Sequence, residues 1–273
     1  MEQTAVDRVL RTLEVGGTTV ATLVDGGASP VAWSPRPFLH PVRTLAGTVL
    51  TDARPDDHPW HCGVGTAVPD VDGVNCWGGP TYVPGTGYEE CDDHGRAVAT
   101  AVSDGDGTLT QRLRWTGPDG ALVLRETRTL TWGASDGGWV LGWTSAFRAP
   151  GSSPVRLGSP GSHGRAGAGY GGFTWRFAPC DDVAVRTSTA VGEDAVHGAV
   201  APWVEWTGTF DGRHGSGARA SVRFEALGHA DPWFVRVAEY PAVGSALAWD
   251  APVVVEPDAP LVRSFRVTVR DEA

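Results

Sequence analysis

Residues 56–61, with the sequence Asp-Asp-His-Pro-Trp-His, place two imidazoles, two carboxylates and an indole within six positions. The whole chain has only eight histidines. Imidazole is the side chain best suited to proton transfer near neutral pH, and it is the commonest nitrogen ligand of metals. Pro59 excludes a helix through the segment and stiffens the backbone between the two rings. We therefore expect a rigid turn or strand end that holds a chemical site.

Two kinds of chemistry suit His58 and His61. In a catalytic site, one imidazole would act as general acid or base while Asp56 or Asp57 fixes its tautomer. In a metal site, both would bind one divalent metal, with His94 or a carboxylate as a third ligand. The spacing alone is a weak signal, because it lacks the glutamate and helical spacing of zinc proteases. A third interpretation leaves one ring at the surface and the other bonded to a backbone carbonyl.

The acidic segment 88–96 holds five acidic or imidazole groups, among them His94. It is either a solvated turn or the far wall of an acidic cleft. Because Gly95 follows His94, we expect a tight turn that places this imidazole at the mouth of a strand.

Glu126 interrupts an apolar pattern. In the expected strand 121–132, the even positions share one face, and they are Leu122, Leu124, Glu126, Arg128 and Leu130. An unpaired charge on an apolar face is costly. Glu126 and Arg128 therefore form a satisfied ion pair, or Glu126 is an acid, base or metal ligand in a cleft.

The glycine-rich segment 162–176 lacks the phosphate-loop pattern and a following helix, so we expect no nucleotide cofactor. Its glycines suit a close backbone approach to a flat ligand or to another strand. Arg165, Tyr170 and Arg176 offer stacking faces and groups that recognise hydroxyls or carboxylates.

Indole faces that cover the apolar side of a sugar ring are typical of carbohydrate sites. Most of the twelve Trp are expected in the core. The candidates for sugar contact are Trp60, Trp77, Trp175, Trp203 and Trp206.

Strand patterns recur along the chain and are separated by clusters of Gly, Pro and Asp. They cover residues 18–24, 108–115, 121–132, 139–148, 184–189, 203–210, 218–225, 234–239 and 261–270. Helical patterns are confined to the first dozen residues and to residues 241–248. We therefore predict an all-β protein, a large antiparallel β-sandwich that forms one domain over residues 1–273. Residues 149–172 are expected to be a long loop within it.

Composition excludes several classes of partner. The chain of 273 residues has a formal net charge of −10 and contains no lysine, which argues against nucleic acid and anionic membranes as partners. No apolar run approaches the length of a membrane span, and the first residues do not resemble a secretory signal. A cytoplasmic protein is the expectation, and a homo-oligomer is compatible with the sequence. The four cysteines show no paired spacing, which favours free buried thiols over a disulfide or a Cys/His zinc site.

Several blocks resemble the PmoA-like family of unknown function. The resemblance runs in order from about residue 18 to residue 271, and its most specific blocks are 56–63 (Asp-Asp-His-Pro-Trp-His-Cys-Gly) and 169–173 (Gly-Tyr-Gly-Gly-Phe). Further blocks lie at residues 36–42, 92–96 and 196–198, and in the closing segment from Asp231-Pro232-Trp233 to Asp271. The family's usual pattern has His at position 60 and Arg at position 62, where this chain has Trp60 and Cys62.

The resemblance implies a fold similar to the galactose-mutarotase-like supersandwich. It places Arg36, His58, His61, His94 and Tyr170 at motif positions. The "methane oxygenase" label often given to this family fits a chain without a membrane span badly.

The leading hypothesis is a carbohydrate-active enzyme that acts on a sugar or glycoside, such as a keto-glycoside cleaved by elimination or hydrolysis. Its catalytic candidates are His58, His61, His94 and Glu126, with His58, His61 and His94 as candidate metal ligands. Its substrate-binding candidates are Arg36, Trp60, Arg165, Tyr170 and Arg176. The alternatives are a sugar mutarotase or epimerase and a non-catalytic carbohydrate-binding or accessory protein.

Overall fold

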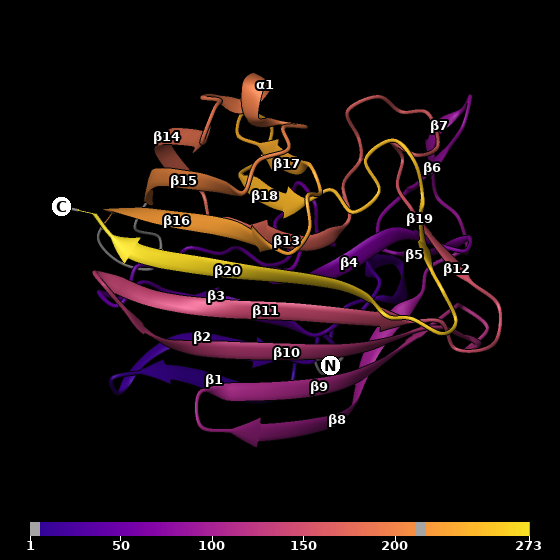
Figure 1. Ribbon diagram of the computed structural model, residues 1–273, viewed down its shortest axis with the longest axis horizontal. Helices are drawn as coiled ribbons and strands as arrows, with labels where there is room; N and C mark the ends of the chain where they lie inside the picture. Colours follow the sequence, from indigo (N-terminus) through magenta and orange to yellow (C-terminus); the bar gives the residue numbers. More distant parts are fainter. Residues whose placement is uncertain (1–5, 211–216, 273) are drawn as a thin grey trace, which may run out of the picture.

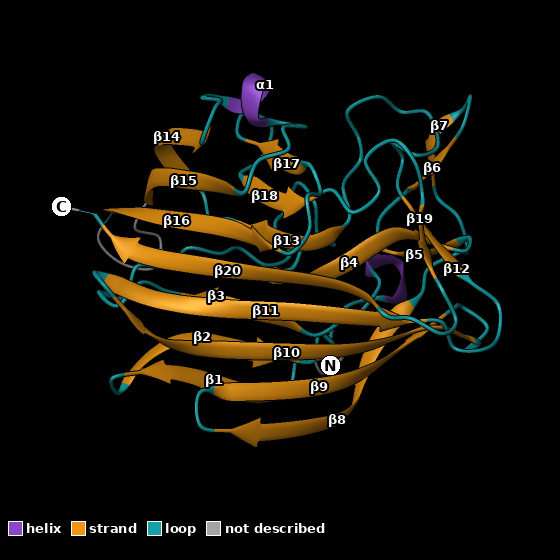
Figure 2. Cartoon of the chain, viewed as in Figure 1, coloured by secondary structure: helices purple, strands orange, loops and turns teal. Residues whose placement is uncertain are grey.

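Two large antiparallel sheets lie face to face in the computed structural model, which describes residues 6–210 and 217–272 (Figure 1). Among these residues, helical structure is confined to two short segments, the 3-10 turn η1 (Val31–Trp33) and α1 (Glu193–Val196) (Figure 2). The predicted all-β class and large antiparallel sandwich are confirmed. Within the described residues, no helix is long and apolar enough to cross a membrane.

The front sheet in Figure 1 has eight strands and includes most of the long strands of the chain. In spatial order its members are β14 (Cys180–Thr187), β15 (Trp203–Phe210), β16 (Ala218–Leu227), β20 (Leu261–Asp271), β11 (Gly138–Arg148), β10 (Leu122–Ser135), β9 (Thr108–Thr116) and β8 (Arg96–Gly105).

The second sheet has ten strands, and a separate two-stranded hairpin projects beside it. Its main path is β1 (Val9–Val15), β2 (Thr18–Val24), β3 (Phe38–Val42), β4 (Val64–Val71), β13 (Gly172–Arg176), β18 (Ala242–Ser245) and β17 (Trp233–Arg236). Off this path lie β5 (Val74–Cys76), β12 (Val155–Gly158) and β19 (Val253–Val255). The hairpin is β6 (Thr81–Val83) with β7 (Gly87–Glu89).

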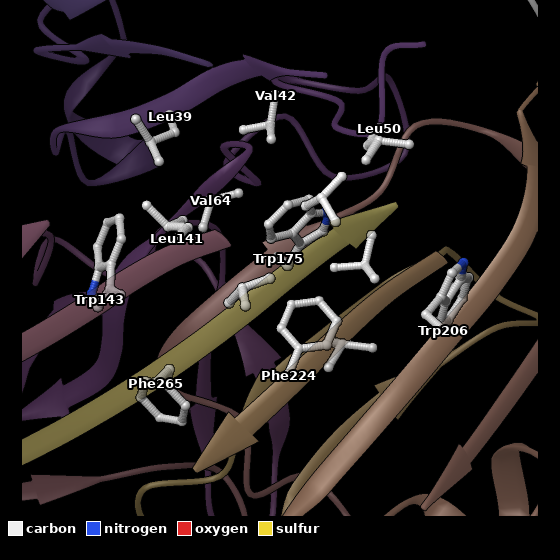
Figure 3. Packing of buried hydrophobic residues seen from close by; sticks show 14 of the residues in the cluster. Leu39, Val42, Leu50, Val64, Leu141, Trp143, Trp175, Trp206, Phe224 and Phe265 are labelled. Carbon is white, nitrogen blue, oxygen red and sulfur yellow. The ribbon is translucent and has the colours of Figure 1, made fainter. Parts of the chain in front are cut away.

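The core lies between the sheets because side chains alternate along each strand. On β20, Phe265 and Val267 are buried while Arg266 is exposed. On β13, Trp175 packs edge to face on Phe224 at 5.4 Å between ring centroids, and both belong to the cluster shown in Figure 3. Arg176, the next residue on β13, belongs to the opposite face of the strand. Alternation therefore separates the core from the surface on which the site is built.

Two local expectations of helix are wrong, and the loop expected at 149–172 is present but interrupted by a short strand. Residues 9–12 lie in β1 and not in a helix, because β1 pairs with β2 through Gly16 and Gly17, both at positive φ. Residues 1–5 lie outside the described part of the chain. The expected helix at 241–248 contains β18, and the expected loop at 149–172 contains β12. In each case, pairing with a neighbouring strand overrides the local pattern.

Asp231 links β18 of the ten-stranded sheet to β20 of the eight-stranded sheet. Its Oδ2 accepts hydrogen bonds from Arg263 Nε on β20 (2.6 Å) and Ser245 Oγ on β18 (3.1 Å), and His229 Nδ1 lies 3.3 Å away. Burial alone would raise the pKa of Asp231, but the neighbouring His229 and Arg263 side chains lower it below the ordinary value of 3.8. The carboxylate is therefore stabilised in its charged form in the folded state.

We expect Asp231→Asn to lower the free energy of unfolding at pH 7 by about 2–4 kcal/mol, because it leaves the Arg263 charge without its counter-ion. A depressed pKa contributes stability above the unfolded value near pH 4, and this contribution is lost as pH falls through the folded value. The Tm difference between wild type and variant, measured by calorimetry, should therefore be largest at pH 7 and shrink below pH 4. Asp106→Asn in an exposed turn is the control, and an equal effect of both substitutions would contradict the assignment.

Candidate functional site

A hollow of about 300 Å³ opens where the loops of the ten-stranded sheet meet, and it continues inward into a narrow recess. The two spaces share His61, Trp77, Tyr170, Phe234 and Tyr240. Among the described residues, every lining side chain belongs to the ten-stranded sheet, the β6–β7 hairpin or the connections between them. The eight-stranded sheet therefore supports the site from behind without lining it.

A tight double turn presents the two histidines. His58 N donates to Pro55 O (3.2 Å), and His61 N donates to His58 O (2.8 Å). Arg54 N donates to His61 O (2.8 Å) and closes the loop at its base. Gly63 follows at a φ of 43°, where a Cβ would lie 2.1 Å from Leu39 O, so only glycine fits. The rigid turn expected from Pro59 is present.

The rings of His58 and His61 stack at 4.7 Å between centroids with an interplanar angle of 17°. His58 Nδ1 lies 2.8 Å from Asp57 Oδ2. Because an ionised carboxylate only accepts hydrogen bonds, Nδ1 carries the proton, and Nε2 of neutral His58 is left as a free base. Asp57 is thus the carboxylate that fixes the tautomer of His58.

His61 has the opposite tautomer. Arg176 Nη1 lies 3.5 Å from His61 Nδ1, and a guanidinium only donates. His61 Nδ1 therefore accepts, and the proton of the neutral ring sits on Nε2. Arg176 Nη2 also donates to both oxygens of Asp57 at 2.9 Å, so one guanidinium aligns the residues behind both rings.

Burial sets the protonation of this group. Burial, reinforced by the charges of His58, Arg176 and Arg36, lowers the pKa of His61 well below 6.5, so its ring is neutral at pH 7. Burial raises the pKa of Tyr240, which packs on both histidines, to about 12. For Asp57, burial alone would raise the pKa, but His58 and Arg176 lower it, so the carboxylate stays ionised.

Arg36 holds two walls of the hollow in place. It is almost fully buried, and its Nη1 donates to the carbonyls of Trp33, Ser34 and Trp77 at 2.9–3.2 Å. Its Nη2 donates to Trp60 O at 2.9 Å. The loops that carry Trp60 and Trp77 are therefore tied to one buried cation.

Asn75 and His94 shape the wall loop, residues 77–79. Asn75 Oδ1 accepts from the backbone N–H groups of Trp77 and Gly78, and His94 Nε2 lies 2.8 Å from Gly79 O. At Gly79 a Cβ would lie 2.4 Å from the indole of Trp60, so that ring lies against bare backbone. Asn75 and His94 are positioning residues for the wall.

At the outer end of the hollow, Arg165 Nη1 donates to Tyr88 Oη at 3.0 Å, and Tyr88 Oη lies 3.0 Å from Tyr170 Oη. The Tyr170 ring packs between Trp77 (4.8 Å) and Phe234 (5.6 Å). Burial raises the pKa of Tyr170 well above 10, so its hydroxyl stays protonated.

The described residues do not fit the expected metal. No three His, Cys, Asp or Glu side chains among them gather in a way that could hold a metal ion. His94 does not join His58 and His61, because its Nε2 is bonded to Gly79 O behind the wall loop. Each of the two stacked rings is engaged through Nδ1, His58 with Asp57 and His61 with Arg176.

A model of a family of unknown function, DUF6807, matches residues 11–273, nearly the whole chain. The chain belongs to this family. No protein with a curated description matches the DUF6807 chain. The similarity to the PmoA-like family stays a prediction.

Three solved structures resemble the DUF6807 chain in outline. A putative aldose 1-epimerase from Escherichia coli K12 is 14% identical over 98% of this chain and 100% of that chain, with a TM-score of 0.49. The polysaccharide lyase BACCELL_00875 is 10% identical over 98% of this chain and 32% of that chain (TM-score 0.38). The GH36 α-galactosidase AgaA from Geobacillus stearothermophilus, in its complex with raffinose, is 10% identical over 85% and 30% (TM-score 0.36). All three TM-scores lie below 0.5, so the chemistry of the hollow must be read from its own residues.

Most of the residues proposed from the sequence converge on the hollow of the DUF6807 chain. These are Arg36, His58, Trp60, His61, Arg165, Tyr170 and Arg176. Of the other tryptophans proposed for sugar contact, Trp77 lines the hollow and Trp175 borders the recess from the core. Trp206 stacks on Phe177 in the core, and Trp203 packs with Arg223 on the eight-stranded sheet.

His94 and Glu126 are not among the lining residues. Glu126 is fully buried and accepts from Arg128 Nε (2.8 Å) and Nη2 (3.0 Å), Trp115 Nε1 (3.0 Å) and Ser145 Oγ (2.7 Å). The structure therefore places Glu126 in a satisfied ion pair with Arg128, the first of the two interpretations that its strand allowed, and not in a cleft.

Sequence reasoning missed Tyr240, Asn75 and Arg236. Tyr240 follows a strand in a loop without a pattern, and Asn75 acts through backbone contacts that no spacing reveals. Arg236 shares a face with Phe234 on β17, and that pairing of an arginine with an aromatic was an available signal. Cys62, which borders the recess, and Cys76 are buried free thiols, as expected, whereas the free thiol of Cys91 is half-buried.

We expect Glu126→Gln to lower the free energy of unfolding by about 2–4 kcal/mol, because it leaves the buried Arg128 charge without its counter-ion. Chemical denaturation followed by Trp fluorescence measures this loss. Glu239→Gln, at the exposed rim of the hollow, is the matched control and should change stability little. Equal stability of the Glu126 variant and wild type would contradict a structural role.

Proposed function

We propose that the protein is a carbohydrate-active enzyme that removes a proton from a carbon next to a ketone of a bound sugar. The observation that carries the proposal is the stacked histidine pair, whose partners give the two rings opposite tautomers. Such a pair supplies a base and a hydrogen-bond donor side by side, which is what enolisation of a ketone requires.

The walls of the hollow suit a sugar. Trp60, Trp77 and Tyr240 offer aromatic surface that can cover the apolar face of a pyranose. A volume of about 300 Å³ lies at the small end of ligand pockets and suits a ligand of the size of a monosaccharide. Tyrosine hydroxyls and guanidinium groups around these rings can bind sugar hydroxyls.

His58 acts as the base. Asp57 orients its ring and stabilises the imidazolium that forms when Nε2 takes a proton. Neither His58 Nε2 nor His61 Nε2 has a hydrogen-bond partner among the described residues, so both nitrogens are available to a ligand.

His61 acts as the donor to the ketone oxygen. Its pKa is low, so it stays neutral and donates through Nε2–H, while the positive charges of Arg176 and Arg36 behind it favour the developing enolate. His58 and His61 therefore lie in different environments, which give one the role of base and the other the role of donor. Such a difference between neighbouring titratable groups is typical of acid–base sites.

Applied to a keto-glycoside, these roles give elimination. His58 takes the proton from the carbon next to the ketone, and the electrons of that C–H bond form the enolate. The enolate then expels the oxygen substituent at the neighbouring carbon. That oxygen takes up the proton held by His58, and an unsaturated keto-sugar and a free alcohol result.

A second candidate is epimerisation at the carbon next to the ketone. Tyr240 supports it, since its ring lies 5.2 Å from that of His61 and its hydroxyl stays protonated. A proton returned by Tyr240 to the opposite face of the enolate would invert that carbon without releasing an alcohol.

The test is incubation with a 3-keto-glycoside that has a chromogenic aglycone, in D₂O after exhaustive chelation. We expect release of the aglycone with exchange of the proton next to the ketone. His58→Gln and Asp57→Asn should each lower kcat by about 10²–10⁴-fold, the usual contribution of a positioned base. Exchange with inversion but without aglycone release would favour the epimerase.

The matched control is His163→Gln. His163 also pairs with a carboxylate, Asp70 Oδ2 at 2.7 Å, but it does not line the hollow. Its substitution should leave kcat unchanged. Binding of the sugar without exchange or release would mean that the site is non-catalytic, and activity that survives in the His58 variant would exclude His58 as the base.

A further inference from the structure

Arginine side chains dominate the charge of the hollow in a chain with a net charge of −10. Among the described residues, four arginines line the hollow or its recess: Arg36, Arg165, Arg176 and Arg236. The carboxylates that face them are Asp57, which binds Arg176, and Glu239, which lies 3.7 Å from Arg236. The space that receives the ligand is therefore cationic.

Arg165 differs from the other three in its partners. Arg36 is bonded to four carbonyls, Arg176 to Asp57, and Arg236 to the carbonyl of Val235. In the described part of the chain, Arg165 has neither a carboxylate nor a carbonyl for its guanidinium. Among the described residues, the guanidinium donates to the hydroxyl of Tyr88, whose ring also lies 5.1 Å from it.

The backbone around Arg165 is well anchored. Arg165 N donates to Pro160 O (2.9 Å), and Ala168 N donates to Arg165 O (3.1 Å). The guanidinium thus extends from a closed turn toward two tyrosine hydroxyls that are themselves 3.0 Å apart. The hydroxyl of Tyr170 stays protonated, so it remains a donor.

The acidic residues near Tyr88 do not cancel this charge inside the hollow. Glu89 follows Tyr88 on β7, and alternation along the strand places it on the opposite face of the hairpin. Glu89 and Glu90 are both exposed, as are Tyr88 and Arg165 at the mouth of the hollow, and neither glutamate forms an ion pair with Arg165 among the described residues. The donors of Arg165, Tyr88 and Tyr170 thus form a group without an internal acceptor of matching charge.

We propose that the sugar bound in the hollow carries an anionic oxygen group, a carboxylate or a phosphate, that is bound by Arg165 together with the hydroxyls of Tyr88 and Tyr170. A guanidinium binds either group through two parallel hydrogen bonds. The inference rests on the proposed function, because it assumes that the ligand is a sugar, and it specifies that this sugar is anionic. The anionic end lies at the Arg165 side of the hollow, and the reacting carbon lies beside the histidine pair.

Binding tests the proposal without reference to catalysis. Calorimetric titration of the full chain with glucose, glucuronate and glucose 6-phosphate should show about 10- to 100-fold tighter binding of one or both anionic sugars. The two anionic arms distinguish a carboxylate from a phosphate. Arg165→Met should abolish the preference and leave glucose binding within about threefold, and Arg165→Lys should retain part of it. Arg156→Met, at an exposed strand position, is the control and should change nothing.

Equal affinities for the three sugars, or a preference that survives in Arg165→Met, would overturn the anion site. Cleavage assays with the neutral, uronate and 6-phosphate forms of one 3-keto-glycoside separate this failure from that of the proposed function. Efficient cleavage of all three with equal kcat/KM would leave the enolisation intact and remove the anion site. Preferential binding of the anionic sugars without cleavage would retain the anion site and remove the enolisation.

Discussion

The contact between the guanidinium of Arg36 and four backbone carbonyls is the constraint on which the hollow depends. These carbonyls come from three separate segments, which hold Trp33 and Ser34, Trp60, and Trp77. A buried cation without a carboxylate is tolerated only where oriented dipoles replace its hydration. The four carbonyls in turn have few alternative partners in a buried environment. The aromatic walls are thus set by a polar interaction beneath them, and their spacing does not depend on contact between the indole rings.

Above Arg36, two side chains of the same type, His58 and His61, form an asymmetric pair. His58 has a carboxylate behind it and partial exposure to solvent, whereas His61 has a guanidinium behind it and is buried. Arg176 connects both arrangements, because it holds Asp57 with one nitrogen and approaches His61 with another. One residue on β13 therefore sets the tautomer of His61 directly and that of His58 through Asp57, more than a hundred positions earlier in the chain.

The sequence predicts the fold class and most of the site, and the failures have physical causes. Alternation identified β20 and the inward face of β10, because period 2 is local information. His58 and His61 were found because two imidazoles lie within four residues of a chain with only eight histidines, Arg176 because it ends the glycine-rich segment, and Arg36 through the family resemblance. His94 has the same residue type but serves the backbone of the wall loop, which no spacing shows. Tyr240 reaches the pocket through the connection between β17 and β18, and that proximity exists only after the sheet forms. The prediction of a helix near the N-terminus is wrong because its residues 9–12 belong to β1, the edge strand that pairs with β2.

The eight-stranded sheet contributes no side chain to the hollow within the described chain, although it provides one face of the core. Its outward positions, many of them threonine and arginine, do not contact the hollow. Substitutions on the outer face of this sheet can therefore accumulate, or create new interactions, without changing the hollow. The buried aromatic side chains on its inner face preserve the fold. The fold thus assigns the chemical constraints to the ten-stranded sheet and leaves the outer face of the eight-stranded sheet free to vary.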